Sequence, residues 1–102
     1  MDRYPMMTLL VRSFPCLKGA PTPFDCMTLY RWVWRCGGED KGRQQAVRFC
    51  LDVFNPGAAD CCAEGDARKR KLPPFDLHNA LSVWGPGDRN AFAVWVNRPW
   101  WP

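Results

Sequence analysis

The segment EDKGRQQAVRFCLDVFNPG, residues 39–57, decides the fold class. It opens with an acidic pair and closes with Asn-Pro-Gly, and these are common start and stop signals of a helix. Between them the polar and apolar residues separate at helical spacing. The polar stripe consists of Lys41, Gln45, Arg48 and Asp52, and the apolar face of Ala46, Val47, Cys50, Leu51, Val53 and Phe54. An amphipathic helix packed on a core is therefore predicted.

The preceding segment, residues 25–38, predicts a second helix that is buried on most of its circumference. Asp25 is a candidate N-cap, and two glycines at positions 37 and 38 give a stop signal. The polar residues from 26 to 36 form only a narrow stripe of Thr28, Arg31 and Arg35. Because Trp32 and Trp34 point to different faces of this helix, at least one is expected to reach a groove or a partner.

The C-terminal third predicts two more helices and a tail. Asp76 caps a short helix in which Leu77, Leu81 and Trp84 share an inward face. The segment DRNAFAVWVN, residues 88–97, fits a helix or a strand by periodicity alone. We expect a helix, because the chain offers no second convincing strand to pair with it. The last five residues, RPWWP, are expected to form an extended tail.

The remaining segments look irregular. Four prolines, at positions 5, 15, 21 and 23, interrupt residues 1–24, where the apolar run 6–11 fits a short strand, a helical turn or an arm. Residues 57–74 hold almost no large apolar side chain and predict an exposed basic loop. The 102 residues therefore predict one all-α domain: a small bundle of about four helices, an irregular N-terminal arm (1–24) and an extended Trp-rich C-terminal tail (98–102).

The positive charge is concentrated in one place. The chain has 14 Lys and Arg residues against 10 Asp and Glu, and the consecutive Arg68, Lys69, Arg70 and Lys71 account for the whole excess. A nearly neutral body with one cationic strip is not typical of a protein that wraps duplex nucleic acid. The apolar run 6–11 is too short for a signal peptide or a membrane span, so a cytoplasmic location and no membrane partner are expected.

The sequence offers no catalytic or metal-binding motif. The six cysteines include no Cys-x-x-Cys pair, and in a reducing cytosol they are expected to be free thiols. His78, the single histidine, is the one available base for a cysteine nucleophile, and its position at a helix start favours a solvent-facing group. We therefore predict a protein that is not an enzyme and has no catalytic residues, no cofactor and no metal.

Residues 37–57 followed by PFDLHNALSVW, residues 74–84, resemble an uncharacterised family of small bacterial proteins encoded on integrative mobile elements and plasmids. The resemblance covers roughly residues 29–96 and rests on Gly42, Gln44, Phe49, Leu51, Phe54, Asn55, Phe75, Asp76, Leu77 and Leu81. It implies an all-helical core and a mobile-element setting, and no activity. The N-terminal arm, the basic run and the tryptophan tail lie outside the family's pattern.

These features predict a non-enzymatic interaction protein that binds and occludes a host protein or nucleoprotein complex. By analogy alone, an anti-CRISPR-type inhibitor of a defence system is one form of that role. The predicted partner-binding residues are Arg68, Lys69, Arg70, Lys71, Trp100 and Trp101. The alternative is a weak accessory protein that binds nucleic acid without sequence preference through the same residues. Self-association through exposed apolar patches is a further expectation.

Overall fold

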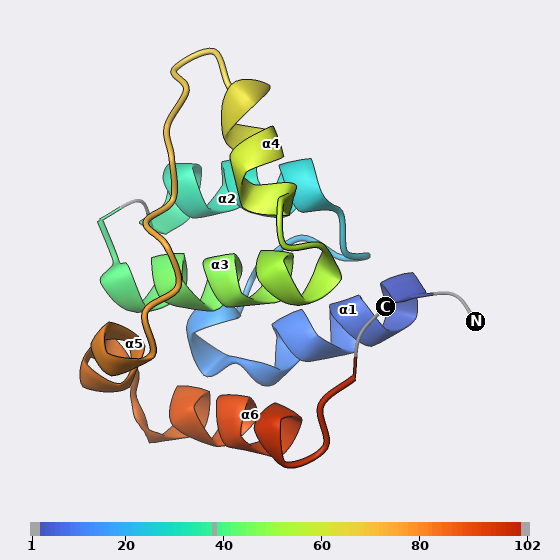
Figure 1. Cartoon of the computed structure of the whole chain (residues 1–102), viewed down its shortest axis with the longest axis vertical. Helices are drawn as coiled ribbons and strands as arrows, with labels where there is room; N and C mark the ends of the chain where they lie inside the picture. The colour runs from blue at the N-terminus through green and yellow to red at the C-terminus, as the bar shows by residue number, and fades with distance from the viewer. Residues whose placement is uncertain (1–2, 38, 101–102) are drawn as a thin grey trace.

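The computed structural model describes residues 3–37 and 39–100, which form six α-helices, one 3₁₀ turn and no strand (Figure 1). The elements are α1 Arg3–Ser13, η1 Pro15–Leu17, α2 Cys26–Gly37, α3 Lys41–Phe54, α4 Ala58–Glu64, α5 Leu77–Val83 and α6 Pro86–Asn97. The all-α class and a helix over residues 91–96 are confirmed. The expected number of about four helices is wrong.

The two additional helices occupy segments whose sequence looked irregular. Helix α1 replaces most of the predicted N-terminal arm, and its Pro5 lies in the first turn, where a missing backbone N–H costs no hydrogen bond. Helix α4 lies inside the predicted exposed loop. Its buried face consists of small residues, Ala58, Ala59, Cys62 and Ala63. Alanine favours the helix strongly but gives little apolar pattern, so a search for large side chains misses it.

Three aspartates set the starts of helices. The carboxylates of Asp25, Asp40 and Asp76 each accept a hydrogen bond from the backbone N–H three residues later, at 2.9, 3.0 and 3.3 Å. Each bond satisfies one of the N–H groups that a helix leaves without an intrahelical partner. The predicted starts at Asp25 and Asp76 and the acidic cap before α3 are confirmed.

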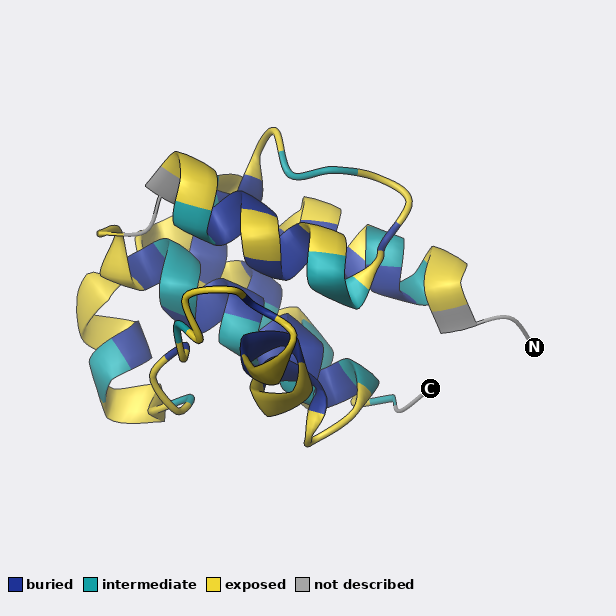
Figure 2. Ribbon diagram, turned by 90° about the horizontal axis from the view of Figure 1, so that it is seen from above, coloured by how far each residue is buried: buried dark blue, intermediate teal, exposed yellow. Residues whose placement is uncertain are grey.

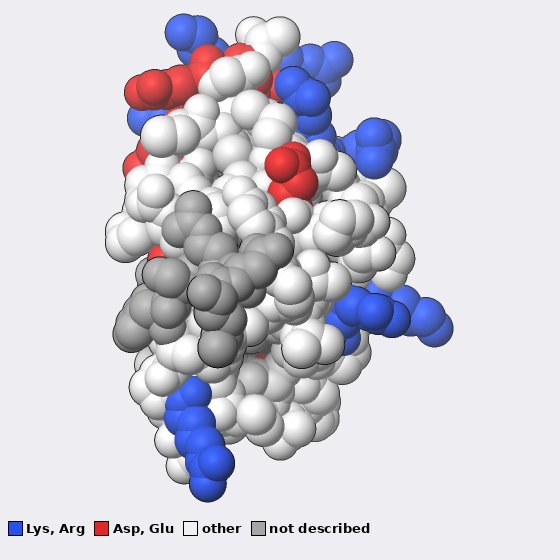
Figure 3. Space-filling view, turned by 90° about the vertical axis from the view of Figure 1, so that its right-hand side faces the viewer, with Lys and Arg blue, Asp and Glu red and all other residues white. Residues whose placement is uncertain are grey.

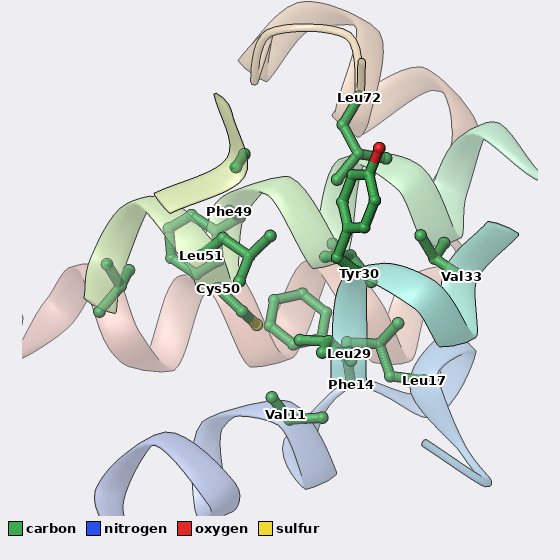
Figure 4. Packing of buried hydrophobic residues seen from close by; sticks show 14 of the residues in the cluster. Val11, Phe14, Leu17, Leu29, Tyr30, Val33, Phe49, Cys50, Leu51 and Leu72 are labelled. Carbon is green, nitrogen blue, oxygen red and sulfur yellow. The ribbon is translucent and has the colours of Figure 1, made fainter. Parts of the chain in front are cut away.

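Helix α3 lies at the centre of the molecule, with α2 and α4 on one side and α1 and α6 on the other (Figure 1). Figure 2 shows that the inward faces of the helices are the buried ones. Phe49 of α3 packs against side chains from several other segments, including α6. Its ring centroid lies 5.1 to 6.0 Å from those of four aromatic side chains: Phe14, Phe75, Phe92 and Trp95. Figure 4 shows Phe14, Leu29 and Cys50 converging between α1, α2 and α3.

Helix α5 is rotated away from its predicted orientation. Trp84 is buried and its indole N–H donates to the carbonyl oxygen of Gly42 at 3.0 Å. Gly42 permits this approach, since a Cβ there would lie 3.3 Å from the carbonyl oxygen of Val83. Leu77 and Leu81, predicted to face inward with Trp84, are instead 46% and 42% exposed. The inward position of α5 is taken by Ala80.

Candidate functional site

Residues 66–71, the cationic part of the loop predicted over 57–74 and called the basic loop from here on, are held in a fixed shape by Asp66. This buried carboxylate accepts hydrogen bonds from the backbone N–H of Arg70 at 3.0 Å and from its guanidinium Nε at 2.9 Å and Nη2 at 3.1 Å. The hydroxyl of Tyr30, on α2, contacts both the Asp66 carboxylate and the Arg70 carbonyl oxygen. Arg70 also lies over the ring of Trp34, 5.4 Å from its centroid. The loop is thus tied to α2.

These contacts pair one of the four cations of the loop and leave the other three exposed. The hydrogen bonds from Arg70 hold the pKa of Asp66 well below its usual range, so the carboxylate stays charged and paired at neutral pH. Arg70 is therefore engaged within the protein, and its role in binding a partner stays a prediction. Arg68, Lys69 and Lys71 are exposed. Lys69 has a φ of 50°, in the left-handed region that non-glycine residues rarely adopt.

Two side chains of α3 hold the chain that follows the loop. Arg48 Nη1 donates to the carbonyl oxygen of Leu72 at 3.2 Å. Gln45 is 1% exposed; its Nε2 donates to Pro74 at 3.2 Å and its Oε1 accepts from the N–H of Asp76 at 2.9 Å. The sequence placed Gln45 on the exposed stripe of α3. Its burial is explained by these bonds, because an extended segment without a helix or sheet needs other partners for its backbone groups.

A second surface lies between α1 and α6, at the opposite side of α3. We name it the α1–α6 groove; its cavity volume is about 540 Å³, and it is lined by Met6, Leu9, Leu10, Ser13, Asn90, Ala91, Val94, Trp95, Asn97, Arg98 and Trp100. The two helices run antiparallel, as Figure 1 shows. Most of the lining is apolar, and it includes side chains the core does not use.

Two aliphatic side chains of the groove are mostly exposed. Leu9 is 68% and Val94 is 64% exposed, the highest values among the large apolar residues that the structure describes. Single exposed leucines are ordinary on protein surfaces. Here they stand beside Trp95 and Trp100 on the walls of one groove. A contiguous apolar surface of this kind is typical of interaction sites.

Among the residues that the structure describes on α1, on α6 and at the groove, the exposed charged side chains are basic. Arg98 lines the groove. Arg12 lies outside the lining, three residues after Leu9 and so beside it on the surface of α1, and itself lines a separate hollow with Val11 and Lys18. Among residues 3–37 and 39–100, neither guanidinium makes an ion pair or a hydrogen bond. The acidic residue of α6, Asp88, is buried and accepts from the N–H of Cys16 at 2.9 Å. In Figure 3, acidic and basic side chains both gather toward the upper end, and the lower half, outside the grey atoms, is mainly uncharged with basic side chains at its borders.

Neither a cysteine nor His78 lines the α1–α6 groove. None of the six cysteines, all of which the structure describes, forms a disulfide bond. Burial raises the pKa of the Cys16 and Cys50 thiols far above the usual value, so both stay protonated at neutral pH. His78 is exposed on α5. No group of three or more His, Cys, Asp or Glu side chains that could hold a metal ion occurs in the part of the chain that the structure describes.

The structure separates the residues that were predicted to act together. The basic loop lies at the end of the molecule beyond α4, while Trp100 lines the groove at α1 and α6 (Figure 1). Trp101 lies outside the described residues. Trp100 is half-buried against the core and does not protrude. At least one of Trp32 and Trp34 was expected to reach a groove or a partner. Arg43 lies over the Trp32 ring and Arg70 over the Trp34 ring.

Sequence reasoning missed Leu9, Val94 and Arg98. The apolar run 6–11 was expected to form a short strand, a helical turn or an arm, and its place in a groove wall depends on α6. That pairing joins residues more than 75 positions apart, and local periodicity carries no such information.

None of the described helices is long and apolar enough to cross a membrane. Comparisons with protein-family models, with curated proteins and with solved structures found no match. The resemblance to a mobile-element family therefore stays a prediction.

Proposed function

We propose that this protein is a non-enzymatic interaction protein that binds a host protein through the α1–α6 groove and occludes part of its surface. The observation that carries the proposal is the exposure of Leu9 and Val94 on an apolar groove of about 540 Å³ that Trp95 and Trp100 also line. Removing exposed apolar area from water favours association, and the ordering of the two partners opposes it. Tryptophan is also among the residue types that dominate binding energies.

The setting of this interaction is a separate part of the proposal. A bacterial mobile element as the source, and a defence complex as the target, follow from the resemblance and from analogy. The apolar lining of the groove supports binding to a protein and does not identify that protein.

The test is capture of a partner from bacterial lysate, with and without nuclease, by the wild-type chain and by Leu9→Asp/Val94→Asp. A nuclease-resistant partner that the wild type retains and the groove variant loses supports the proposal. Leu81→Asp, on α5, is the matched control, because Leu81 is an exposed leucine outside the groove. Loss of the partner in this control, or retention by the groove variant, contradicts the proposal.

A second candidate is weak binding of nucleic acid through the basic loop. It is supported by the exposure of Arg68, Lys69 and Lys71 on a turn whose shape Asp66 fixes. With Arg70 paired, the loop can neutralise at most about three phosphates, which predicts a slope of log K against log salt near −3 on duplex DNA. A salt series with duplex and single-stranded DNA, run on the wild type and on the triple alanine variant, tests this candidate.

A further inference from the structure

The groove has the length and pattern that fit one side of a helix. Its α1 wall comes from residues 6, 9, 10 and 13 and its α6 wall from residues 90 to 98, so each wall extends over roughly 10–12 Å, or about two helical turns. A partner helix presents apolar side chains at i, i+3, i+4 and i+7 over the same length. Placed between the antiparallel α1 and α6, such a helix would complete a small three-helix layer.

The charges restrict the chemistry of that helix. Arg98 on the lining and Arg12 beside Leu9 are exposed cations without partners among the described residues. On α1 and α6 the structure describes no exposed acidic side chain that offsets them, since Asp88 is buried against Cys16. A helix with glutamates or aspartates flanking its apolar stripe would place carboxylates near both guanidinium groups. Complementary charges of this kind fix orientation and exclude wrong partners.

A second copy of the chain fits the groove less well. In a symmetric dimer the same surface faces itself, so Arg12 and Arg98 would face the same two cations of the other copy. Nucleic acid also fits less well. The floor and rims of the groove offer one lining cation, Arg98, against aliphatic side chains of Met6, Leu9, Leu10 and Val94, and phosphates gain nothing from these.

We propose that the α1–α6 groove binds an acidic amphipathic helix of a partner protein, with its apolar stripe on Leu9, Val94 and Trp95 and its carboxylates at Arg12 and Arg98. The proposal rests on the function proposed above and specifies the partner's chemistry at the same site. It fails separately if a protein partner does bind in the groove but carries no acidic helix.

The first experiment uses two helical peptides of about 18 residues, a length at which helices begin to be stable in water. Both carry leucines at i, i+3, i+4 and i+7; one has glutamates at the flanking positions and the other has lysines. Fluorescence anisotropy at low salt measures their affinity for the wild-type chain. The acidic peptide is expected to bind about tenfold more tightly than the basic one. Equal binding, or preference for the basic peptide, overturns the proposal.

A charge exchange sharpens the result. Arg12→Glu/Arg98→Glu is expected to reverse the preference, so that the basic peptide binds more tightly. Leu9→Asp/Val94→Asp is expected to abolish binding of both peptides, and Leu81→Asp to leave both unchanged. Circular dichroism checks that each variant keeps its helix content. Insensitivity to the charge exchange contradicts the proposed chemistry but leaves a protein partner in the groove tenable, whereas insensitivity to Leu9→Asp/Val94→Asp contradicts both.

Two further measurements separate the other occupants. Light scattering of the wild type and of Leu9→Asp/Val94→Asp detects a dimer through the groove, and a dimer that only the wild type forms overturns the proposal. A fluorescent single-stranded DNA that the acidic peptide displaces from the wild type also overturns it, because the groove would then be a nucleic-acid site.

Discussion

Arg70 and Arg98 lie in opposite parts of the molecule and have opposite roles. Arg70 donates three hydrogen bonds to the buried Asp66 carboxylate and lies over the ring of Trp34. Its positive charge is therefore paired within the protein. Arg98 is exposed beside an apolar groove and has no acidic partner among residues 3–37 and 39–100. Of the four cations in the basic loop, Arg70 is thus paired within the protein, whereas the cation that lines the groove is not. A partner that covers exposed apolar side chains and pairs with an unpaired charge stabilises the complex through both contacts.

The largest effect is expected from the residue that supports the groove from inside. Phe49→Ala should lower the free energy of unfolding by about 3–5 kcal/mol. The substitution removes a ring that packs against four other aromatic side chains, and it leaves a cavity among them. Leu9→Ala, on the outer wall, should change it by less than about 0.5 kcal/mol. Urea unfolding followed by circular dichroism measures both. Equal losses of stability in the two variants would show that Leu9 belongs to the core and is not an exposed side chain of the groove.

A smaller loss is expected where α3 holds the chain after the basic loop. Gln45→Ala should lower the free energy of unfolding by about 1–3 kcal/mol, since the carbonyl oxygen of Pro74 and the N–H of Asp76 lose their partner. Lys41→Ala, an exposed change on the same helix, is the control. Native-state hydrogen exchange should show faster exchange at Asp76 in the Gln45 variant alone. Unchanged exchange there would mean that the segment is held by other contacts.

The stability of the loop should depend on pH in a direction that Asp66 sets. Hydrogen bonds from Arg70 lower the pKa of this carboxyl in the folded state below about 3.9, the value expected in the unfolded chain. The stabilisation is therefore complete above about pH 4 and is lost as the pH falls through the folded-state pKa. Asp66→Asn should flatten the acid limb of a plot of stability against pH.

Some acid dependence should remain in the Asp66→Asn variant. Hydrogen bonds from Thr28 lower the pKa of Asp25 as well. Asp25→Asn is therefore the matched control, and the double variant should show the weakest acid dependence. An acid limb that is unchanged by Asp66→Asn would mean that the pairing of Asp66 with Arg70 adds nothing to stability.

The smallest effect on stability is expected from the free cations of the loop. Arg68→Ala, Lys69→Ala and Lys71→Ala should each change the free energy of unfolding by less than about 0.5 kcal/mol, because these side chains are exposed. Thermal unfolding measures the change. A substantial loss of stability would show that these side chains, like Arg70, take part in holding the loop.

The local sequence was sufficient for features that depend on neighbouring residues. Asp25, Asp40 and Asp76 could be recognised as caps because a cap needs only the backbone three residues further on. The polar stripe of Thr28, Arg31 and Arg35 is exposed as its spacing predicts. Helix α4 escaped notice, since its buried residues are mostly alanines, whose small side chains leave no clear apolar pattern.

Contacts between distant residues decided the candidate sites. Four adjacent cations look alike in the sequence, but Asp66 and Tyr30 take one of them, Arg70, into the structure. The contact of Trp84 with Gly42 turns Leu77 and Leu81 outward. The groove exists only because α6 lies beside α1.

The sequence by itself determined the helical class, three helix starts and the amphipathic α3, because these follow from spacing and from hydrogen bonds within one turn. Only the tertiary structure decided which cations and which apolar side chains remain available to a partner. Which side chains stay exposed depends on the contacts between segments that are distant in the sequence, and a local sequence pattern does not contain those contacts.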